Sequence, residues 1–199
     1  MVLLLALLAS CAFDAPARTE EVPDGVMDMV PGRRTVAPDG VTEAVVAEGG
    51  ELRIRVGRNT SETLDEGVDA RVAFSPDSRV LVYARLDDEG ETNLWRARRD
   101  GSRFASTEQL TFGRGSEDRP AFSPDGQRVA FVSGKGGIAA WWSVDAGGNV
   151  TQLTNIDLPA HAPGSPPDGF LPVPDGVEYS WDAEGLRWVA AGKEYRVQP

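Results

Sequence analysis

The sequence contains one cysteine and one histidine in 199 residues, so no intrachain disulfide can form and no His/Cys zinc site is present. His161 stands in a proline-rich stretch, and no GxSxG nucleophile motif accompanies it. The chain also lacks a GK[ST] phosphate loop, and its acidic clusters lack the fixed spacing of a calcium loop. We therefore expect no cofactor, no metal ion and no catalytic residue.

Basic residues are scarce as well: 20 lysines and arginines stand against 31 acids, a net charge of −11. Nucleic-acid-binding domains usually carry a basic face, so nucleic acid is not an expected partner. Hydrophobic residues make up 41% of the chain, which is ordinary for a globular protein of a size that needs no disulfides. Glycine (22) and proline (14) recur in PDG and GG pairs, which predicts many tight turns between short strands.

The single cysteine follows a short apolar run. Residues 1–10 contain VLLLALLAS, which is uncharged, too short to span a bilayer as a helix, and typical of a signal-peptide core. The string LASC resembles a bacterial lipobox, which implies that Cys11 is lipidated and begins the mature protein. Residues 11–33 would then be a flexible tether, and Ala12 implies sorting to the outer membrane. The alternatives are a signal peptide without lipid or a buried N-terminal strand.

One motif occurs twice, 48 residues apart, as AFSPDS at 73–78 and AFSPDG at 121–126. Proline fixes φ for a turn, aspartate caps it, and glycine takes a position that requires positive φ. A nearly continuous apolar run follows each copy, as expected of a strand buried on both faces. The turn residues that we single out are Phe74, Pro76 and Asp77 in the first copy and Phe122, Pro124, Asp125 and Gly126 in the second.

Each strong copy continues through an aromatic strand and a polar turn to the string QLT, which gives four strands per unit. A weaker copy begins at Ala37-Pro38-Asp39-Gly40. A last unit turns at 167–169, at 174–176 or at Ala183-Glu184-Gly185. The four units span approximately 34–66, 70–113, 119–155 and 160–199.

These lengths are close to the roughly 40–45 residues of a four-stranded propeller blade. The predicted fold is therefore all-β, a small β-propeller of about four four-stranded blades. Since propellers have four to eight blades, an open or incomplete ring is the alternative.

The strings AFSPDG, RVAFVS and TQLTN resemble the TolB-type WD-like repeat. In that family the propeller is a periplasmic protein-binding platform that engages an outer-membrane lipoprotein, and related blades gate prolyl-oligopeptidase-type peptidases. TolB itself carries more blades and an additional N-terminal domain, so the resemblance concerns blade architecture. TolB is also soluble, while the lipobox indicates a lipid anchor here. Together the two resemblances imply a non-enzymatic cell-envelope lipoprotein whose propeller is a scaffold for an envelope protein and which reaches the membrane through its lipid.

Five tryptophans occur in the repeats, two of them adjacent at Trp141 and Trp142. Neighbouring strand residues face opposite sides, so one of the two is exposed or lies between blades, and we single out the pair as a partner contact. The alternative function is a glycan-binding or hydrolytic propeller that uses funnel carboxylates and tryptophans. Its signature would be two carboxylates about 5–9 Å apart in a cleft. A truncated gene product without independent function is a third alternative.

Overall fold

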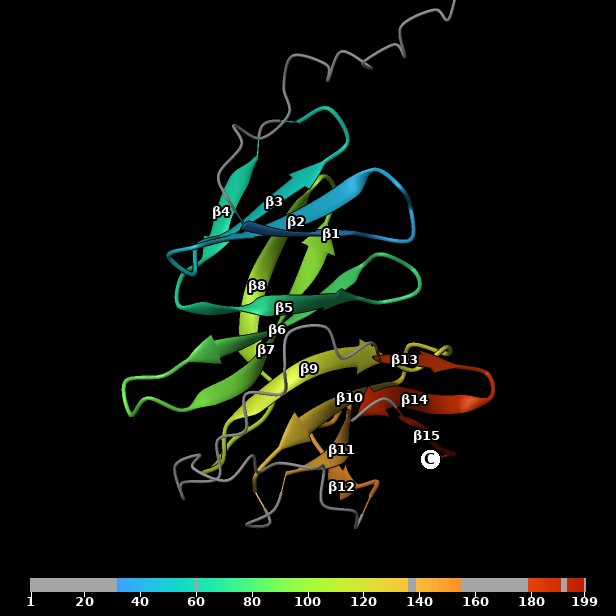
Figure 1. Ribbon diagram of the computed structural model, residues 1–199. Coiled ribbons are helices and arrows are strands. Elements are labelled where there is room, and N and C mark those ends of the chain that lie inside the picture. The colour runs from blue at the N-terminus through green and yellow to red at the C-terminus, as the bar shows by residue number, and fades with distance from the viewer. Residues whose placement is uncertain (1–31, 60, 136–138, 155–178, 191–192, 199) are drawn as a thin grey trace, which may run out of the picture.

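The computed structural model describes residues 32–59, 61–135, 139–154, 179–190 and 193–198 (Figure 1). The predicted signal peptide, Cys11, most of the tether, and His161 lie outside these ranges. The described residues form fifteen strands and no helix, so the all-β class is confirmed. Within the same ranges there is no helix with the length and apolarity needed to cross a membrane.

The strands form four separate antiparallel sheets, and each sheet is a meander in which consecutive strands pair. The first sheet contains β1 (Gly32–Val36), β2 (Thr42–Ala47), β3 (Leu52–Val56) and β4 (Glu62–Asp65). The second contains β5 (Val68–Phe74), β6 (Val80–Leu86), β7 (Thr92–Asp100) and β8 (Arg103–Gln109). The third contains β9 (Glu117–Phe122), β10 (Arg128–Ser133), β11 (Ala140–Asp145) and β12 (Val150–Gln152). The fourth contains β13 (Tyr179–Asp182), β14 (Gly185–Ala190) and β15 (Lys193–Val197).

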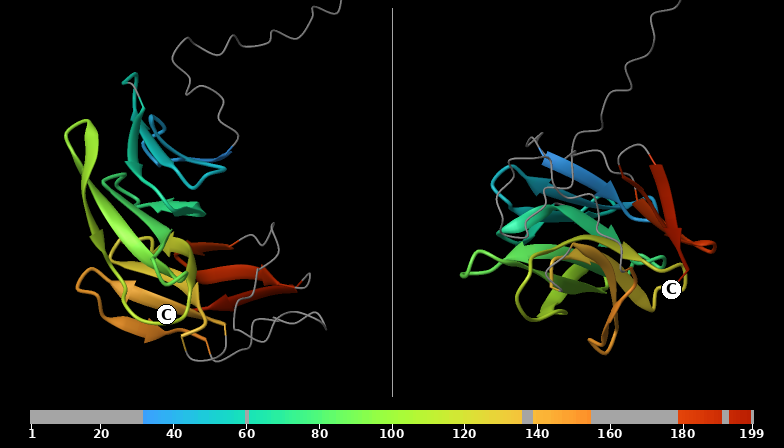
Figure 2. Two further views of the ribbon diagram at one scale, coloured as in Figure 1. Left: turned by 90° about the vertical axis from the view of Figure 1, so that its left-hand side faces the viewer. Right: turned by 60° about the horizontal axis from the view of Figure 1, so that its bottom comes forward.

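The four sheets are arranged as the blades of a four-bladed β-propeller (Figure 2). The first strands of successive blades lie next to one another, β1 beside β5, β5 beside β9 and β9 beside β13, so these strands surround the centre. The predicted propeller is therefore confirmed. The fourth blade differs from the prediction in having three strands, not four, within the described residues.

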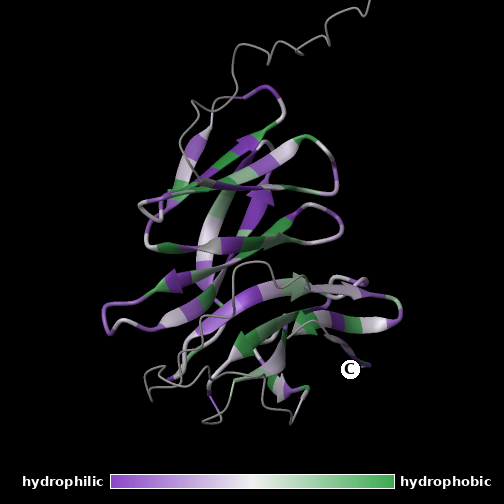
Figure 3. Ribbon diagram, in the orientation of Figure 1, coloured by the Kyte–Doolittle hydropathy of each residue, from purple (hydrophilic) through white to green (hydrophobic). Residues whose placement is uncertain are grey.

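Hydrophobic residues concentrate on the strands, whereas the hairpin ends are mostly hydrophilic (Figure 3). The described residues form three hydrophobic clusters, each between two successive blades. The first includes Leu52 and Phe74, the second Leu94 and Phe131, and the third Trp141 and Leu186. A single blade cannot bury its two faces alone, so these clusters are what hold the array together.

The outer faces of the first and last blades are charged. On the first blade, Glu43 pairs with Arg34 and, at 2.7 Å, with Arg55, on the side opposite the apolar cluster. On the last blade, Arg187 lies 3.7 Å from Glu194 on the side opposite Leu186. A polar outer face is what terminal units of a repeat array require. The first and last blades would meet through these two faces if the propeller closed into a ring, and both faces are charged.

The turn of the last repeat lies at Asp182–Gly185, where Asp182 pairs with Gly185 and Tyr179 with Trp188. Of the three turns that the sequence allowed, Ala183-Glu184-Gly185 is therefore the one that joins β13 to β14. The predicted positive φ also occurs, at 70° in Gly126. In the second repeat, Ser78 takes the same position with φ 59°.

Candidate functional site: the centre of the propeller

The SPD motif builds a hydrogen-bonded hairpin. The Ser123 hydroxyl donates to Oδ1 of Asp125 at 2.6 Å, and the N–H of Arg128 donates to Ser123 Oγ at 2.9 Å. Ser75 and Asp77 repeat the first of these bonds at 2.6 Å. The motif therefore closes a turn with its own side chains, and its residues serve local structure.

The turns of neighbouring blades also touch. A Cβ added to Gly126 would lie 3.4 Å from Cδ of Pro76, and the N–H of Asp39 donates to Ser78 Oγ at 2.9 Å. Phe74, which precedes the second turn, is 9% exposed and packs in the first apolar cluster. The predicted turn residues thus fix how one blade sits against the next.

Trp141 and Trp142 point to opposite sides of β11, as the strand geometry predicted. Trp141 is 1% exposed and packs against Tyr179 and Trp188, with ring centroids 5.6 and 5.9 Å away. Trp142 is half-buried and packs in the cluster between the second and third blades. Trp141 is therefore closed to a partner in this structure, while a contact through Trp142 stays a prediction.

The other three tryptophans also pack on the blades. Trp188 is 3% exposed and stacks on Tyr195, with ring centroids 5.6 Å apart. The guanidinium of Arg85 lies 4.6 Å from the ring centroid of Trp95. Trp181 packs in the cluster between the third and fourth blades. The tryptophans are thus used for packing between and against blades.

Charged side chains from the first strands of the second and third blades gather at the centre. The guanidinium of Arg71, on β5, lies 3.7 Å from Oδ2 of Asp118, on β9. The guanidinium of Arg119 lies 3.7 Å from the same oxygen. From the fourth blade, the hydroxyl of Tyr179 donates to the carbonyl of Pro120 at 3.4 Å. The charged cluster of Arg71, Asp118 and Arg119 therefore joins the second and third blades, and Tyr179 links the fourth blade to the same strand β9.

The charges in this cluster act strongly on one another. Burial raises the pKa of Asp118, and the negative charge of Asp69 raises it further against the lowering effect of Arg71 and Arg119. Burial lowers the pKa of Arg119 to about 10, and the nearby positive charge of Arg71 contributes. Burial and the charge of Asp118 raise the pKa of Tyr179 to about 12. The centre thus holds charges of both signs, with Arg71 and Arg119 largely buried and Asp118 partly exposed.

Two β-bulges bring the arginines into place. Between the pairs Val132–Asp118 and Ala130–Ala121 the β9–β10 register shifts, and Arg119 there has a φ of 59°. The β5–β6 register also shifts, between Val68 and Val72, in the stretch that contains Arg71. A bulge redirects a side chain out of the regular alternation.

Sequence reasoning missed these residues, although a signal was present. Arg71 and Arg119 each stand five residues before the turn proline of their repeat, Pro76 and Pro124. Arg33 stands five residues before Pro38 in the first repeat. The same count in the fourth repeat gives Glu178, which lies outside the described residues.

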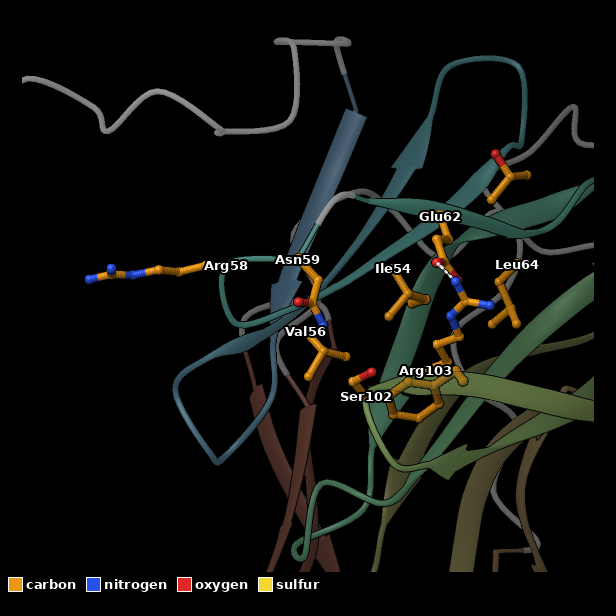
Figure 4. Close-up of a pocket in the computed structure, with 10 residues that line it drawn as sticks. Ile54, Val56, Arg58, Asn59, Glu62, Leu64, Ser102 and Arg103 are labelled. Atoms are coloured by element: carbon orange, nitrogen blue, oxygen red, sulfur yellow. Dashed lines mark ion pairs between the residues drawn. The ribbon is translucent and has the colours of Figure 1, made fainter.

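A hollow lies at the outer rim, between the first two blades, with a volume of about 460 Å³ (Figure 4). Its wall is apolar at Ile54 and Phe104, and an ion pair of 3.0 Å joins Arg103 to Glu62 across it. Arg58 extends away from the other lining residues. This hollow contains no set of groups that could act together on a substrate. Over the described residues as a whole, no group of three or more His, Cys, Asp or Glu side chains could hold a metal ion.

Four meandering sheets around one centre define a β-propeller protein. No family model matches the chain. The chain is 28% identical over 148 residues to Protein TolB homolog from Chlorobium luteolum. The matched segment covers 72% of this chain and 32% of that protein, so the chain spans about a third of the length of this relative. The resemblance of its repeats to the TolB type, which the sequence motifs indicated, is confirmed.

Solved structures agree on the fold. TolB from Acinetobacter baumannii matches 85% of this chain and 45% of its own, with a TM-score of 0.52 and 20% identity. The β-propeller domain of Cps50 (Swd1) from Myceliophteria thermophila matches 84% of this chain and 54% of its own, with a TM-score of 0.55 and 14% identity. At these identities the two structures show the propeller fold alone.

Proposed function

We propose that this TolB-like propeller is a non-enzymatic binding scaffold of the bacterial cell envelope. The family resemblance supports a protein partner on the periplasmic side. The LASC string supports a lipid on Cys11 that anchors the chain, with Ala12 directing it to the outer membrane. In this proposal the propeller engages its partner through the central cluster and the turns around it.

The proposal is supported by the structural roles of the residues that could have formed a catalytic or ligand site. The tryptophans pack between and against the blades, and the SPD motif forms turns. The central carboxylate of Asp118 is held between two guanidiniums, those of Arg71 and Arg119, at 3.7 Å each. Arginine side chains recognise carboxylate and phosphate groups through planar, charge-assisted hydrogen bonds, which suits binding.

The alternative, a hydrolytic or glycan-binding propeller, has one observation in its favour. Asp69 and Asp118 lie close enough for the charge of one to raise the pKa of the other, as in a pair of catalytic acids. Hydrolysis would require one of them to donate a proton to a substrate. A panel of glycoside and ester substrates, assayed with the wild type and with Asp118→Asn, tests this idea. If the wild type turns over a substrate and the variant does not, a hydrolytic function replaces the scaffold proposal.

The scaffold proposal is tested by affinity capture from envelope extract. The wild-type protein should retain a defined envelope protein, and Arg33→Glu, which reverses an exposed charge on the innermost strand β1, should lose it. Arg58→Glu reverses an exposed charge at the outer rim and should retain the partner. If all three proteins capture the same material, the centre is not the contact.

The anchor is tested separately by replacing Cys11 with alanine and following fractionation. The variant should leave the membrane pellet for the soluble fraction, because a lipid chain contributes about 0.8 kcal/mol per buried CH₂ and the variant has none. A variant that stays in the pellet would refute the lipobox.

A further inference from the structure

The strongest feature that the proposed function does not use is the hollow at the outer rim, between the first two blades (Figure 4). Its volume of about 460 Å³ lies within the range of small-molecule sites. Both blades contribute to its wall, with Glu62 at the start of β4 and Arg103 at the start of β8. A ligand in this hollow would therefore contact two blades at once.

The floor of the hollow is apolar and is fixed by the packing of the blades. Ile54 on β3 is 5% exposed and Phe104 on β8 is 8% exposed, and both belong to the apolar cluster between the two blades. Leu64 is partly buried and packs against the same cluster. This surface is already formed without a ligand, and it suits the C–H groups of a ligand rather than its polar groups.

One ion pair supplies polar groups above this floor. The guanidinium of Arg103 lies 3.0 Å from a carboxylate oxygen of Glu62, and the two side chains are 71% and 50% exposed. Figure 4 shows them pointing toward each other, beside Ile54 and Leu64. A guanidinium has five N–H donors and a carboxylate accepts about four hydrogen bonds, so each partner of the pair keeps capacity for a ligand. The hollow thus offers a donor and an acceptor side by side.

The charge of the hollow favours a neutral ligand. Its charged lining residues are Arg58, Glu62 and Arg103, and Arg58 extends away from the others (Figure 4). The charges of the remaining pair cancel, so neither an anion nor a cation gains a net attraction from them. Asn59 and Ser102 line the same hollow and add an amide and a hydroxyl, both of which donate and accept hydrogen bonds.

We infer that this hollow binds a neutral sugar. One hydroxyl of the sugar ring would donate to the carboxylate of Glu62, and the adjacent hydroxyl oxygen would accept a hydrogen bond from Arg103. Neighbouring ring hydroxyls can do this together because each hydroxyl both donates and accepts. The C–H face of the ring would lie on Ile54 and Phe104. Binding of this kind needs no catalytic group, and it would join the first blade to the second.

The test is a calorimetric titration of the purified protein with two neutral disaccharides, cellobiose and N,N′-diacetylchitobiose. Tetraethylene glycol is the comparison probe, because it is neutral and has oxygen acceptors but no adjacent hydroxyls. At least one sugar should saturate, and the glycol should not. Arg103→Ala and Glu62→Ala should each weaken sugar binding about tenfold or more, which is the effect of losing one charge-assisted hydrogen bond.

Arg58→Ala is the matched control. It removes an equal charge from the same hollow, but the side chain extends away from the ion pair, so the affinity should not change. Circular dichroism and melting temperature show whether each variant folds, and Arg103→Ala and Glu62→Ala should both fold because these side chains are half exposed or more.

The inference is overturned if neither sugar saturates, if the glycol binds as tightly as the sugars, or if Arg58→Ala weakens binding as much as Arg103→Ala. It is also overturned if Arg103→Ala and Glu62→Ala both bind as the wild type does. The titration contains no envelope protein, so its outcome is independent of the capture experiment.

Discussion

The guanidinium of Arg99 donates a hydrogen bond of 2.9 Å to Oδ2 of Asp39, which lies 60 residues earlier in the chain. Asp39 belongs to the first turn of the first blade, and Arg99 to β7 of the second. Oδ1 of Asp39 also accepts the N–H groups of Val41 at 3.0 Å and Thr42 at 2.8 Å. Burial alone would raise the pKa of Asp39, but Thr42, Val41 and Arg99 together lower it to about 2. One carboxylate therefore closes a turn and joins two blades.

Replacing Asp39 with alanine should lower the free energy of unfolding by about 1–3 kcal/mol, because several donors lose a charged acceptor. Replacing Arg99 with alanine should cost only about 0–1 kcal/mol, because the pair is partly exposed and the turn keeps its own bonds. Urea denaturation followed by tryptophan fluorescence measures both. Equal losses would mean that the link between the blades matters more than the turn.

The blade pattern could be predicted because turn chemistry is local. Proline, aspartate and a residue with positive φ favour a tight turn, and the apolar runs after Pro76 and Pro124 define the next strand. The last repeat was harder, because three strings could form its turn. Only the pairing of Tyr179 with Trp188 decides among them, and pairing depends on tertiary contacts.

The central cluster could not be predicted from local patterns. It depends on two bulges, in β5 and β9, and on the packing of strands about 48 residues apart, and neither has a signature in a single segment. The spacing of Arg71 and Arg119 from their turn prolines was present in the sequence. Its meaning required knowing that these strands face one centre.

Gly185 should tolerate no side chain. A Cβ there would lie 2.4 Å from the carbonyl oxygen of Val197, and its φ is 127°. Gly40 is the matched control, since its φ is 70° and nothing lies within 4 Å of an added Cβ. Gly40→Ala should cost about 1–2 kcal/mol from backbone strain. Gly185→Ala should cost more, because β14 and β15 must also separate; equal melting temperatures for the two variants would contradict this.

Trp141 should be the most costly tryptophan to remove. It is 1% exposed and forms the centre of the cluster that joins the third and fourth blades. Trp141→Ala should lower the free energy of unfolding by about 3–5 kcal/mol through lost burial and a cavity. Trp181→Ala, at a half-buried position of the same cluster, should cost less. Guanidinium denaturation with near-ultraviolet circular dichroism measures both, and a smaller loss for Trp141→Ala would mean that the two blades do not depend on this contact.

Glu117 should make the protein less stable as the pH rises. Its side chain is 2% exposed, accepts hydrogen bonds from Thr111 and from the N–H of Leu94 at 3.3 Å, and lies 3.9 Å from Nζ of Lys135. Burial raises the pKa of Glu117 above 4.5 despite the lowering effect of these neighbours. The folded state therefore binds this proton more tightly than the unfolded chain, and stability falls as the pH rises above 4.5.

Glu117→Gln keeps both acceptor bonds and removes the ionisation, so it should gain stability over the wild type as the pH is raised from 4.5 towards neutrality. Glu108→Gln is the opposite control. Its hydrogen bond from Arg96 lowers the pKa of Glu108 below 4.5, so the ionised form stabilises the fold. The Glu108→Gln variant should therefore be less stable than the wild type above pH 4.5, and this deficit should shrink as the pH falls below 4.5. Urea denaturation at a series of pH values gives both differences. If the stabilities of the two variants relative to the wild type change with pH in the same direction, burial does not raise the pKa of Glu117.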